Sequence, residues 1–192
     1  MDSPWAGPLL WVAVYTSDYF FTIAGARLCR VQDKIVFAGS FEINPLFQDD
    51  VNALRRLSPR FFLALVLSTG YLVLVRWMAG SSKGFRDVYL LVLGVMFLGE
   101  ATIHMRHLRN WFLFKKAVPL IHGRLEYPRG IILKMSASEM LIFAGLYTVL
   151  YLVTGSMFVL GGALAACALA IKHYLLGRRH AAALAKAALP ST

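Results

Sequence analysis

Three ionisable side chains, Glu100, His104 and His107, follow one another at helical spacing near the end of a long apolar stretch. On a helix, residues at i, i+4 and i+7 project from one face, so we expect these groups to lie together, with Arg106 beside them. Carboxylate and imidazole groups can bind a proton or a cation, and at this spacing they could hold a divalent metal ion. Ionisable side chains are costly in hydrocarbon and by default mark a functional site or a buried pair. This run is therefore the first candidate for a functional site.

A metal site of the kind found in membrane metalloenzymes needs more ligands than Glu100, His104 and His107 provide. Membrane metalloenzymes with clusters of this kind use several more histidines, and the chain has neither an HExxH motif nor paired HxxxH boxes. A divalent ion held by the three residues is one hypothesis for a cofactor, whose identity stays unknown. The alternative is that the two histidines are interfacial polar residues, hydrogen-bonded to loop backbone or to lipid head groups.

Two further carboxylates interrupt apolar stretches: Asp18, with Thr22 one turn beyond it, and Glu139. A charge at bilayer depth costs at least ~2.5–3.5 kcal/mol, which must be offset by pairing, by a water-filled cavity or by protonation. Two interpretations remain open. Either the acids of the three stretches line one polar pathway, or each acid pairs with a nearby basic side chain and only holds helices together.

The composition places these acids in a membrane protein. The chain has 192 residues, of which 58% are hydrophobic and 16% are charged, whereas soluble domains carry about 25% charged residues. A helix needs about 20 apolar residues to cross ~30 Å of hydrocarbon. The stretches that meet this length are 8–28, 59–79, 85–107, 130–154 and 156–176. We therefore predict an all-α, polytopic integral membrane protein with a single membrane domain over 1–192, whose last two helices form a tight antiparallel hairpin.

The distribution of Lys and Arg predicts the orientation of this domain. The net charge is +10, and the basic residues gather in the connections after the first and third spans and near the C-terminus. The positive-inside rule then places these segments and the C-terminus in the cytoplasm and the N-terminus outside. The same residues suit anionic lipid head groups, so we expect the bilayer to be the partner and nucleic acid not to be one. We expect the membrane to be a prokaryotic plasma (inner) membrane.

The connection between the first two spans has structure of its own. Asn44-Pro45 reads as a helix N-cap followed by proline at the first helical position. The segment that follows, about 46–57, has an apolar face and a charged face, which predicts a short interfacial helix. The apolar segment 35–41 is too short to cross, and we expect it to re-enter the membrane or to dip into the interface.

The next basic connection carries a second polar group of residues. Glu126 and Arg129 flank a tyrosine and a proline in a turn, close along the chain to the histidine run. They could fold back to complete a polar site with Glu42, Asn44 and Arg106. The alternative is an ordinary solvated loop.

Asp18, Thr22, Glu42 and Asn44 form a pattern, D-x3-T followed by E-x-N-P, in the first fifth of the chain. This pattern resembles one in small uncharacterised prokaryotic integral membrane proteins, which carry it in a first span and the connection after it. The resemblance implies no activity, because none is known for those proteins. It does imply that the four residues act together.

The last span contains rows of small residues, Gly161 with Ala165, and Gly162 with Ala166 and Ala170. Such rows let helices approach closely in lipid. They could mark packing within the chain or the seam of an oligomer.

The leading functional hypothesis is a small transporter or channel-like protein for a cation, a proton or a small polar solute. Its polar pathway would use the buried carboxylates and a histidine able to titrate near neutral pH. Because one short chain encloses little volume, we expect a homo-oligomer. The alternatives are a membrane enzyme acting on a lipid or isoprenoid at the cytoplasmic interface, with or without a metal, and a non-catalytic subunit of a membrane complex. Motifs for nucleophilic catalysis are missing, which favours a protein that is not an enzyme.

Overall fold

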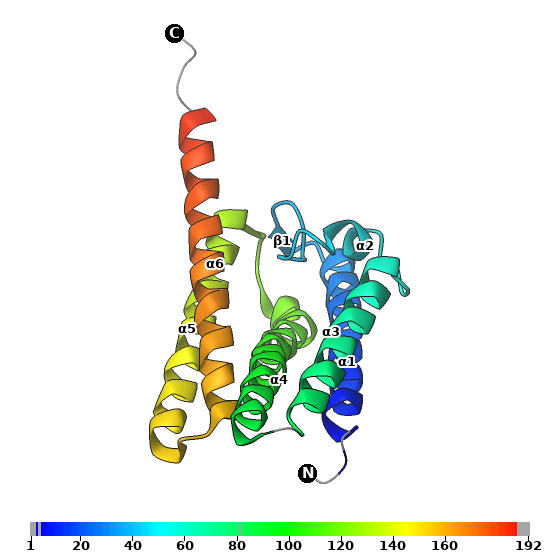
Figure 1. Cartoon of the computed structure of the whole chain (residues 1–192). Coiled ribbons are helices and arrows are strands. Elements are labelled where there is room, and N and C mark those ends of the chain that lie inside the picture. Colours follow the sequence, from blue (N-terminus) through cyan, green and yellow to red (C-terminus); the bar gives the residue numbers. More distant parts are fainter. Residues whose placement is uncertain (1–2, 4, 81, 188–192) are drawn as a thin grey trace.

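The computed structural model describes residues 3, 5–80 and 82–187, without the side chains of Lys83 and residues 184–187. It is built from long helices (Figure 1). Five of them are long and apolar enough to cross a membrane. The elements in chain order are α1 Ala6–Val31, β1 Ile35–Phe37, α2 Gln48–Asn52, α3 Pro59–Met78, α4 Lys83–Phe112, η1 Leu113–Ala117, η2 Val118–Leu120, β2 Leu125–Tyr127, α5 Arg129–Thr154 and α6 Met157–Ala187. The all-helical fold class with five apolar helices is thereby confirmed. The side chains of Lys83 and Lys186 contributed to the predicted charge pattern and lie outside the described residues.

The ends of the helices are set by capping residues, proline and glycine more closely than by where the apolar stretch begins or ends. Helix α3 begins where the Ser58 hydroxyl accepts a hydrogen bond from Phe61 N at 3.2 Å, with Pro59 at the first helical position. Helix α5 ends at Gly155, whose positive φ of 63° closes the predicted tight hairpin to α6. The third and fifth helices run past the predicted spans. The residues added to α6 are mostly alanine and basic residues, and those added to α4 include Arg109, so the charges did not mark a helix end.

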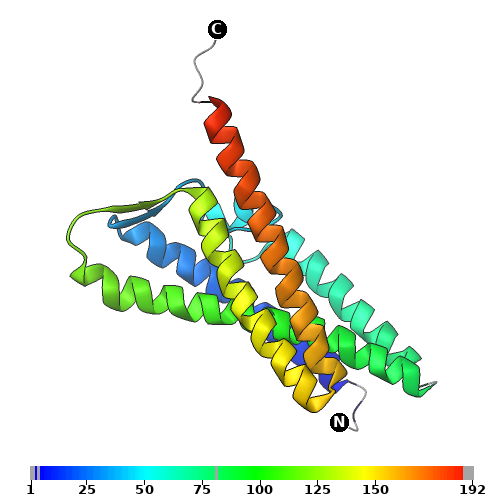
Figure 2. The same cartoon turned by 90° about the vertical axis from the view of Figure 1, so that its left-hand side faces the viewer.

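The α5–α6 hairpin lies across α4, while α1 and α3 pack on the other side of α4 (Figures 1 and 2). Glycines bring α4 and α6 into close contact: a Cβ at Gly94 would strike the backbone of Phe158, and one at Gly161 would strike the backbone of Leu91 and Val95. The predicted rows of small residues therefore pack against α4 within the chain. Small side chains are what allow two helices to approach this closely in lipid.

Aromatic side chains join α1 to α3 and close one end of the bundle. The rings of Trp11, Tyr15, Phe61 and Tyr19 stack in succession, with centroids 5.1, 5.5 and 4.5 Å apart. Trp11 belongs to a buried apolar cluster with residues of α3 and α4, and its indole N–H donates to Ser68 Oγ at 2.9 Å. This cluster fills the half of the bundle nearer the N-terminus.

The opposite end of the bundle is bridged by two short strands. β1 pairs in parallel with β2, with Ile35 opposite Leu125 and Phe37 opposite Tyr127. The segment expected to re-enter the membrane thus forms a strand, because its backbone groups find partners in the connection before α5. The pairing also places both basic connections at the same end of the molecule, as the charge pattern requires.

The predicted interfacial helix over 46–57 is reduced to the short helix α2, with turns on either side. Val51 is only 1% exposed and packs against Tyr19 and Phe61 rather than facing lipid. Asp50 fixes this position, because its carboxylate accepts hydrogen bonds from Ser58 Oγ at 2.5 Å and Arg55 Nη1 at 3.0 Å. The segment is therefore a packed cap on α1 and α3.

The close contact of α4 and α6 predicts a specific cost for one added methyl group. In Gly161→Ala the new Cβ meets backbone atoms that cannot rotate away. Overpacking typically costs 1–3 kcal/mol, so we expect the midpoint of thermal unfolding in detergent to fall by roughly 3–10 °C. Gly145→Ala is the matched control, since a Cβ there meets no heavy atom within 4 Å. Equal midpoints for the two variants would contradict the packing described.

Candidate functional site

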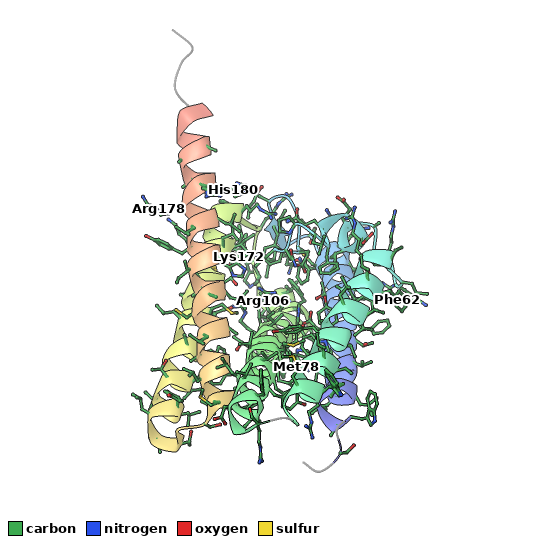
Figure 3. The ribbon with its side chains drawn as sticks, in the orientation of Figure 1. Phe62, Met78, Arg106, Lys172, Arg178 and His180 are labelled. Carbon is green, nitrogen blue, oxygen red and sulfur yellow. The ribbon has the colours of Figure 1, made fainter. Side chains whose placement is uncertain are left out.

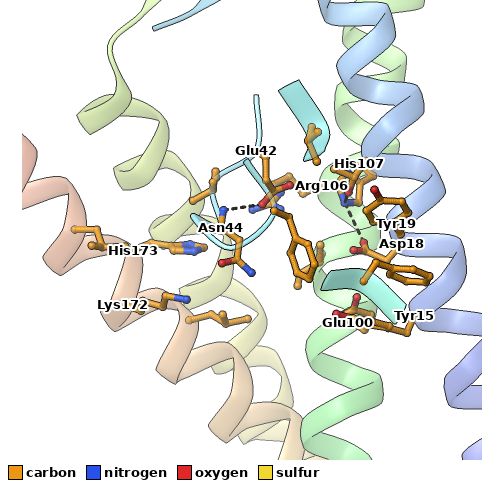
Figure 4. Close-up of a pocket in the computed structure, with 18 residues that line it drawn as sticks. Tyr15, Asp18, Tyr19, Glu42, Asn44, Glu100, Arg106, His107, Lys172 and His173 are labelled. Carbon is orange, nitrogen blue, oxygen red and sulfur yellow. Dashed lines mark hydrogen bonds and ion pairs between the residues drawn. The ribbon is translucent and has the colours of Figure 1, made fainter. Parts of the chain in front are cut away.

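A cavity of about 150 Å³ lies between α1, α4 and α6 under the connection that carries α2. Figure 3 shows Arg106 and Lys172 toward the interior of the bundle, whereas Phe62 and Met78 of α3 point outward. The cavity gathers ionisable and polar side chains from four separate segments (Figure 4). Its polar lining consists of Tyr15, Asp18, Tyr19, Thr22, Glu42, Asn44, Glu100, Arg106, His107, Lys172 and His173. Seven of these are predicted site residues, and they include all four of the D-x3-T and E-x-N-P pattern.

Asp18 and His107 form the central contact of the cavity. The Asp18 Oδ1 atom lies 3.0 Å from His107 Nε2, and the Thr22 hydroxyl lies 3.2 Å from the same nitrogen. The Asp18 and His107 atoms lie within ion-pair distance, but Asp18 Oδ1 has no hydrogen-bond partner among the described residues. The other ring nitrogen of His107, Nδ1, is also fully buried and has no hydrogen-bond partner among the described residues.

His104 faces away from the cavity. Its Nδ1 lies 2.9 Å from the carbonyl oxygen of Glu100, which can only accept, so Nδ1 carries a proton. Its Nε2 lies 2.8 Å from Ser17 Oγ on α1, and its Nδ1 is 3.8 Å from Asp18 Oδ1. The two histidines thus approach the same carboxylate from different sides, but only His107 lines the cavity.

Glu100 lies in the wall of the cavity together with Asp18. It is 8% exposed, and it forms no salt bridge with any described residue. Figure 4 shows its carboxyl group next to Tyr15 and below Asp18. A buried acid without a basic partner is costly in this environment and so is a candidate for binding a proton or a cation.

Glu42 enters the cavity from the connection between β1 and α2. Its Oε1 accepts a hydrogen bond from the backbone N–H of Asn44 at 2.6 Å. The Asn44 side chain accepts a hydrogen bond from Leu46 N at 3.3 Å, as a cap would, but it does so at the turn before α2, whose N-cap is Phe47. Burial raises the pKa of the Glu42 carboxyl above its usual 4.5, and the nearby Arg106 guanidinium only partly opposes this. Glu42 is therefore closer to binding a proton near neutral pH than a surface glutamate.

Three residues of this region, Ser136, Lys172 and His173, were missed by the sequence analysis as members of a site. Arg106 Nη1 donates to Ser136 Oγ at 3.3 Å, which leaves the hydroxyl proton of Ser136 for His173 Nδ1 at 3.0 Å. This chain of contacts joins α4, α5 and α6. A signal for Lys172 and His173 existed, since they are adjacent polar residues inside the fifth apolar span.

Three predicted site residues lie elsewhere. Glu139 of α5 does not reach the cavity with Asp18 and Glu100. It forms a salt bridge with Arg109 of α4 instead. Glu126 is exposed on β2. Arg129 does fold back, but its Nη2 donates to the carbonyl oxygen of Ile43 at 3.3 Å and so holds the connection that carries Glu42.

The arrangement gives little support to a metal centre. Among the described residues, no three His, Cys, Asp or Glu side chains are grouped so that they could hold one ion. The reason is the geometry above: Glu100 points into the cavity, His107 contacts Asp18, and His104 turns toward Ser17. The one-face spacing on α4 did not bring the three groups to a common point.

The cavity ends blindly toward the N-terminal half of the bundle. Tyr15 and Glu100 line it, and the residues one to two turns earlier on the same helices, Trp11, Leu93 and Phe97, belong to the buried apolar cluster. The polar site is therefore closed on one side by tightly packed aromatic and aliphatic side chains.

Comparison of this chain with models of known protein families, with curated proteins and with solved structures finds no match. Its function must therefore be inferred from the site itself.

The raised pKa of Glu42 predicts a pH-dependent stability. Because the carboxyl binds a proton more readily in the folded chain than in the unfolded chain, its charged form destabilises the fold above the raised pKa, and this cost disappears as the pH falls. Glu42→Gln keeps an acceptor for Asn44 N and removes the charge. We expect a thermal midpoint a few degrees above wild type at about pH 8, with the difference shrinking toward about pH 5.

Glu126→Gln, at an exposed position, serves as the control and should leave the pH dependence unchanged. A Glu42→Gln variant that is less stable than wild type at the higher pH would mean that pairing with Arg106 outweighs the cost of burial.

Proposed function

We propose that this protein is a small membrane transporter that exchanges a cation for protons at the cavity of Asp18, Glu42 and Glu100. The observation that carries the proposal is that three carboxylates from three segments far apart in the sequence line one cavity in the interior of the bundle. Helix adhesion alone is served by separate ion pairs, such as the one between Glu139 and Arg109. Gathering like charges is unfavourable unless they share a bound cation or proton.

The basic side chains of the cavity supply the counter-charge when the cation has left. Arg106 lies between Glu42 and the Ser136 hydroxyl, and Lys172 lies at the α6 wall. His107 lies beside Asp18 in the same lining. A cation entering the cavity would displace protons from the carboxyl groups, which is the coupling that exchange requires.

The blind end of the cavity favours alternating access over an open pore. A channel needs a continuous polar path, whereas here the cluster around Trp11 and Leu93 fills the next layer of the bundle. We propose that the end of the bundle where β1 and β2 and the basic connections lie faces the cytoplasm, in keeping with the positive-inside rule. The membrane would be a prokaryotic plasma membrane, and the transporter would assemble as a homo-oligomer.

The test is an exchange assay in proteoliposomes that carry an inward proton gradient, reported by a pH-sensitive dye. Pulses of Na⁺, K⁺, Li⁺ or Ca²⁺ should collapse the gradient for at least one of these ions. Glu100→Gln removes a buried charge from the cavity, and we expect the rate to fall about tenfold or more, as expected for the loss of a charged ligand worth at least ~1.4 kcal/mol.

Glu139→Gln is the matched control, since it removes an equal charge from another apolar helix but outside the cavity, and it should keep most of the activity. No response to any of the four ions in the wild-type protein would overturn the proposal of cation and proton exchange. Equal loss in the two variants would overturn the assignment of the cavity as the site.

A second candidate function, an enzyme acting on a lipid at the membrane interface, is favoured by one observation. The Asp18 carboxylate beside the His107 imidazole, in the lining of a cavity, is a pair of groups from which a general base could be built. The test is incubation of the purified protein with a polar lipid extract and with isoprenoid phosphates, read by mass spectrometry. Turnover that is lost in His107→Gln and kept in His122→Gln, on the exposed connection before β2, would support it. Unchanged lipids with the wild-type protein would exclude it.

A further inference from the structure

A second cavity, of about 260 Å³, adjoins the first and differs from it in character. It lies where the ends of α4 and α5 diverge below the two strands (Figure 2), and α5 packs along α6 and makes little contact with α4. Aromatic and aliphatic side chains form most of its wall. They are Phe37, Phe41, Ile43, Leu113, Tyr127, Ile132 and Met135.

The two cavities share their polar boundary. Glu42, Arg106 and His107 line both of them, and the second cavity adds the guanidinium of Arg109 and the amide of Asn110. Its polar end therefore holds two guanidinium groups, of which that of Arg109 is paired with Glu139. Burial brings the carboxyl of Glu42 closer to its neutral form by raising its pKa.

The wall of the second cavity reaches the surface of the bundle. Met135 in its wall is 42% exposed on α5, roughly 9 Å along the helix axis from its first residue at 1.5 Å per residue. Trp111, next to the lining residue Asn110, is 42% exposed on α4. Exposed tryptophan is typical of the boundary between hydrocarbon and head groups. An apolar cavity with a polar end thus reaches the surface of the bundle close to a residue of that type.

We propose that this second cavity binds an anionic phospholipid, with its phosphate against Arg106 and the start of an acyl chain between Phe41, Tyr127 and Met135. The guanidinium of Arg106 matches the planar pair of phosphate oxygens. The chain continues into the bilayer through the opening beside Met135. This inference concerns binding alone and holds whether or not the neighbouring acids carry out cation exchange.

The primary test is calorimetric titration of detergent-solubilised protein with short-chain phosphatidic acid. The wild-type protein should bind it and should bind neither inorganic phosphate nor short-chain phosphatidylcholine with comparable affinity, because the site requires both a chain and an unmasked phosphate charge. Arg106→Gln should weaken binding about tenfold or more, since a hydrogen bond to a charged group is worth ~1.5–3 kcal/mol.

Two controls separate the site from general effects of charge and bulk. Arg124→Gln removes the same charge from an exposed position in the connection before β2 and should leave the affinity unchanged. Met135→Trp should fill the opening and weaken binding without altering any charge, whereas Met105→Trp, at an exposed position of α4 outside both cavities, should not.

Three results would overturn the inference. The first is binding of inorganic phosphate as tightly as phosphatidic acid, which would make free phosphate the ligand. The second is an equal loss of affinity in Arg106→Gln and Arg124→Gln, which would indicate attraction to the basic surface. The third is wild-type affinity in Met135→Trp. Glu100→Gln lines only the first cavity and should retain lipid binding even where it abolishes exchange. Failure of the exchange assay and failure of the lipid assay are therefore distinguishable.

Discussion

The contact between Asp18 and His107 joins α1 to α4 in the interior of the bundle. A carboxylate in hydrocarbon must be offset inside the bundle, and the imidazole 3.0 Å away can do this while Thr22 approaches the same ring nitrogen. The connection before α3 brings Glu42 to the same cavity, into which α4 places Arg106. Arg129 holds this connection at Ile43, and Tyr19 holds it again by donating to the carbonyl oxygen of Arg55 at 2.8 Å. The polar cavity is thus held from below by helices and from above by a loop.

The sequence carried enough information for the helices and for part of the site. Apolar length determines which segments can cross a bilayer, and the turn at Gly155 determines a hairpin, so both could be predicted. Asp18 and Glu100 were predicted as candidate members of one polar pathway because each interrupts an apolar stretch, and Glu42 was added to the predicted site through the E-x-N-P pattern that follows Asp18 and Thr22. The structure adds that their side chains line a single cavity.

The sequence could not show how helices cross. Glu139 lies in an apolar span like Glu100, but the α5–α6 hairpin lies across α4 at an inclination, so Glu139 meets Arg109 instead of the cavity. The same crossing brings Lys172 and His173 of α6 to the site. It depends on which glycines face which backbone, and that information is spread over Gly94 and Gly161, far apart in the chain. The pairing of β1 with β2 is non-local in the same way.

The two interfaces of α4 differ in what holds them together, and this difference bears on how an exchanging protein would move. Toward α6, glycines seat the two backbones against each other, and no change of protonation alters that packing. Toward α1, the contacts near the cavity are polar: Asp18 with His107, and Ser17 with His104. When a bound proton or cation changes the charge of these groups, the α1–α4 interface gains or loses attraction while the α4–α6 interface does not. Because the aromatic stack from Trp11 to Tyr19 ties α3 to α1, these two helices form the unit that would shift against α4, α5 and α6. The apolar cluster that closes the cavity lies across that same boundary, so a shift there is the one movement that could open the blind end.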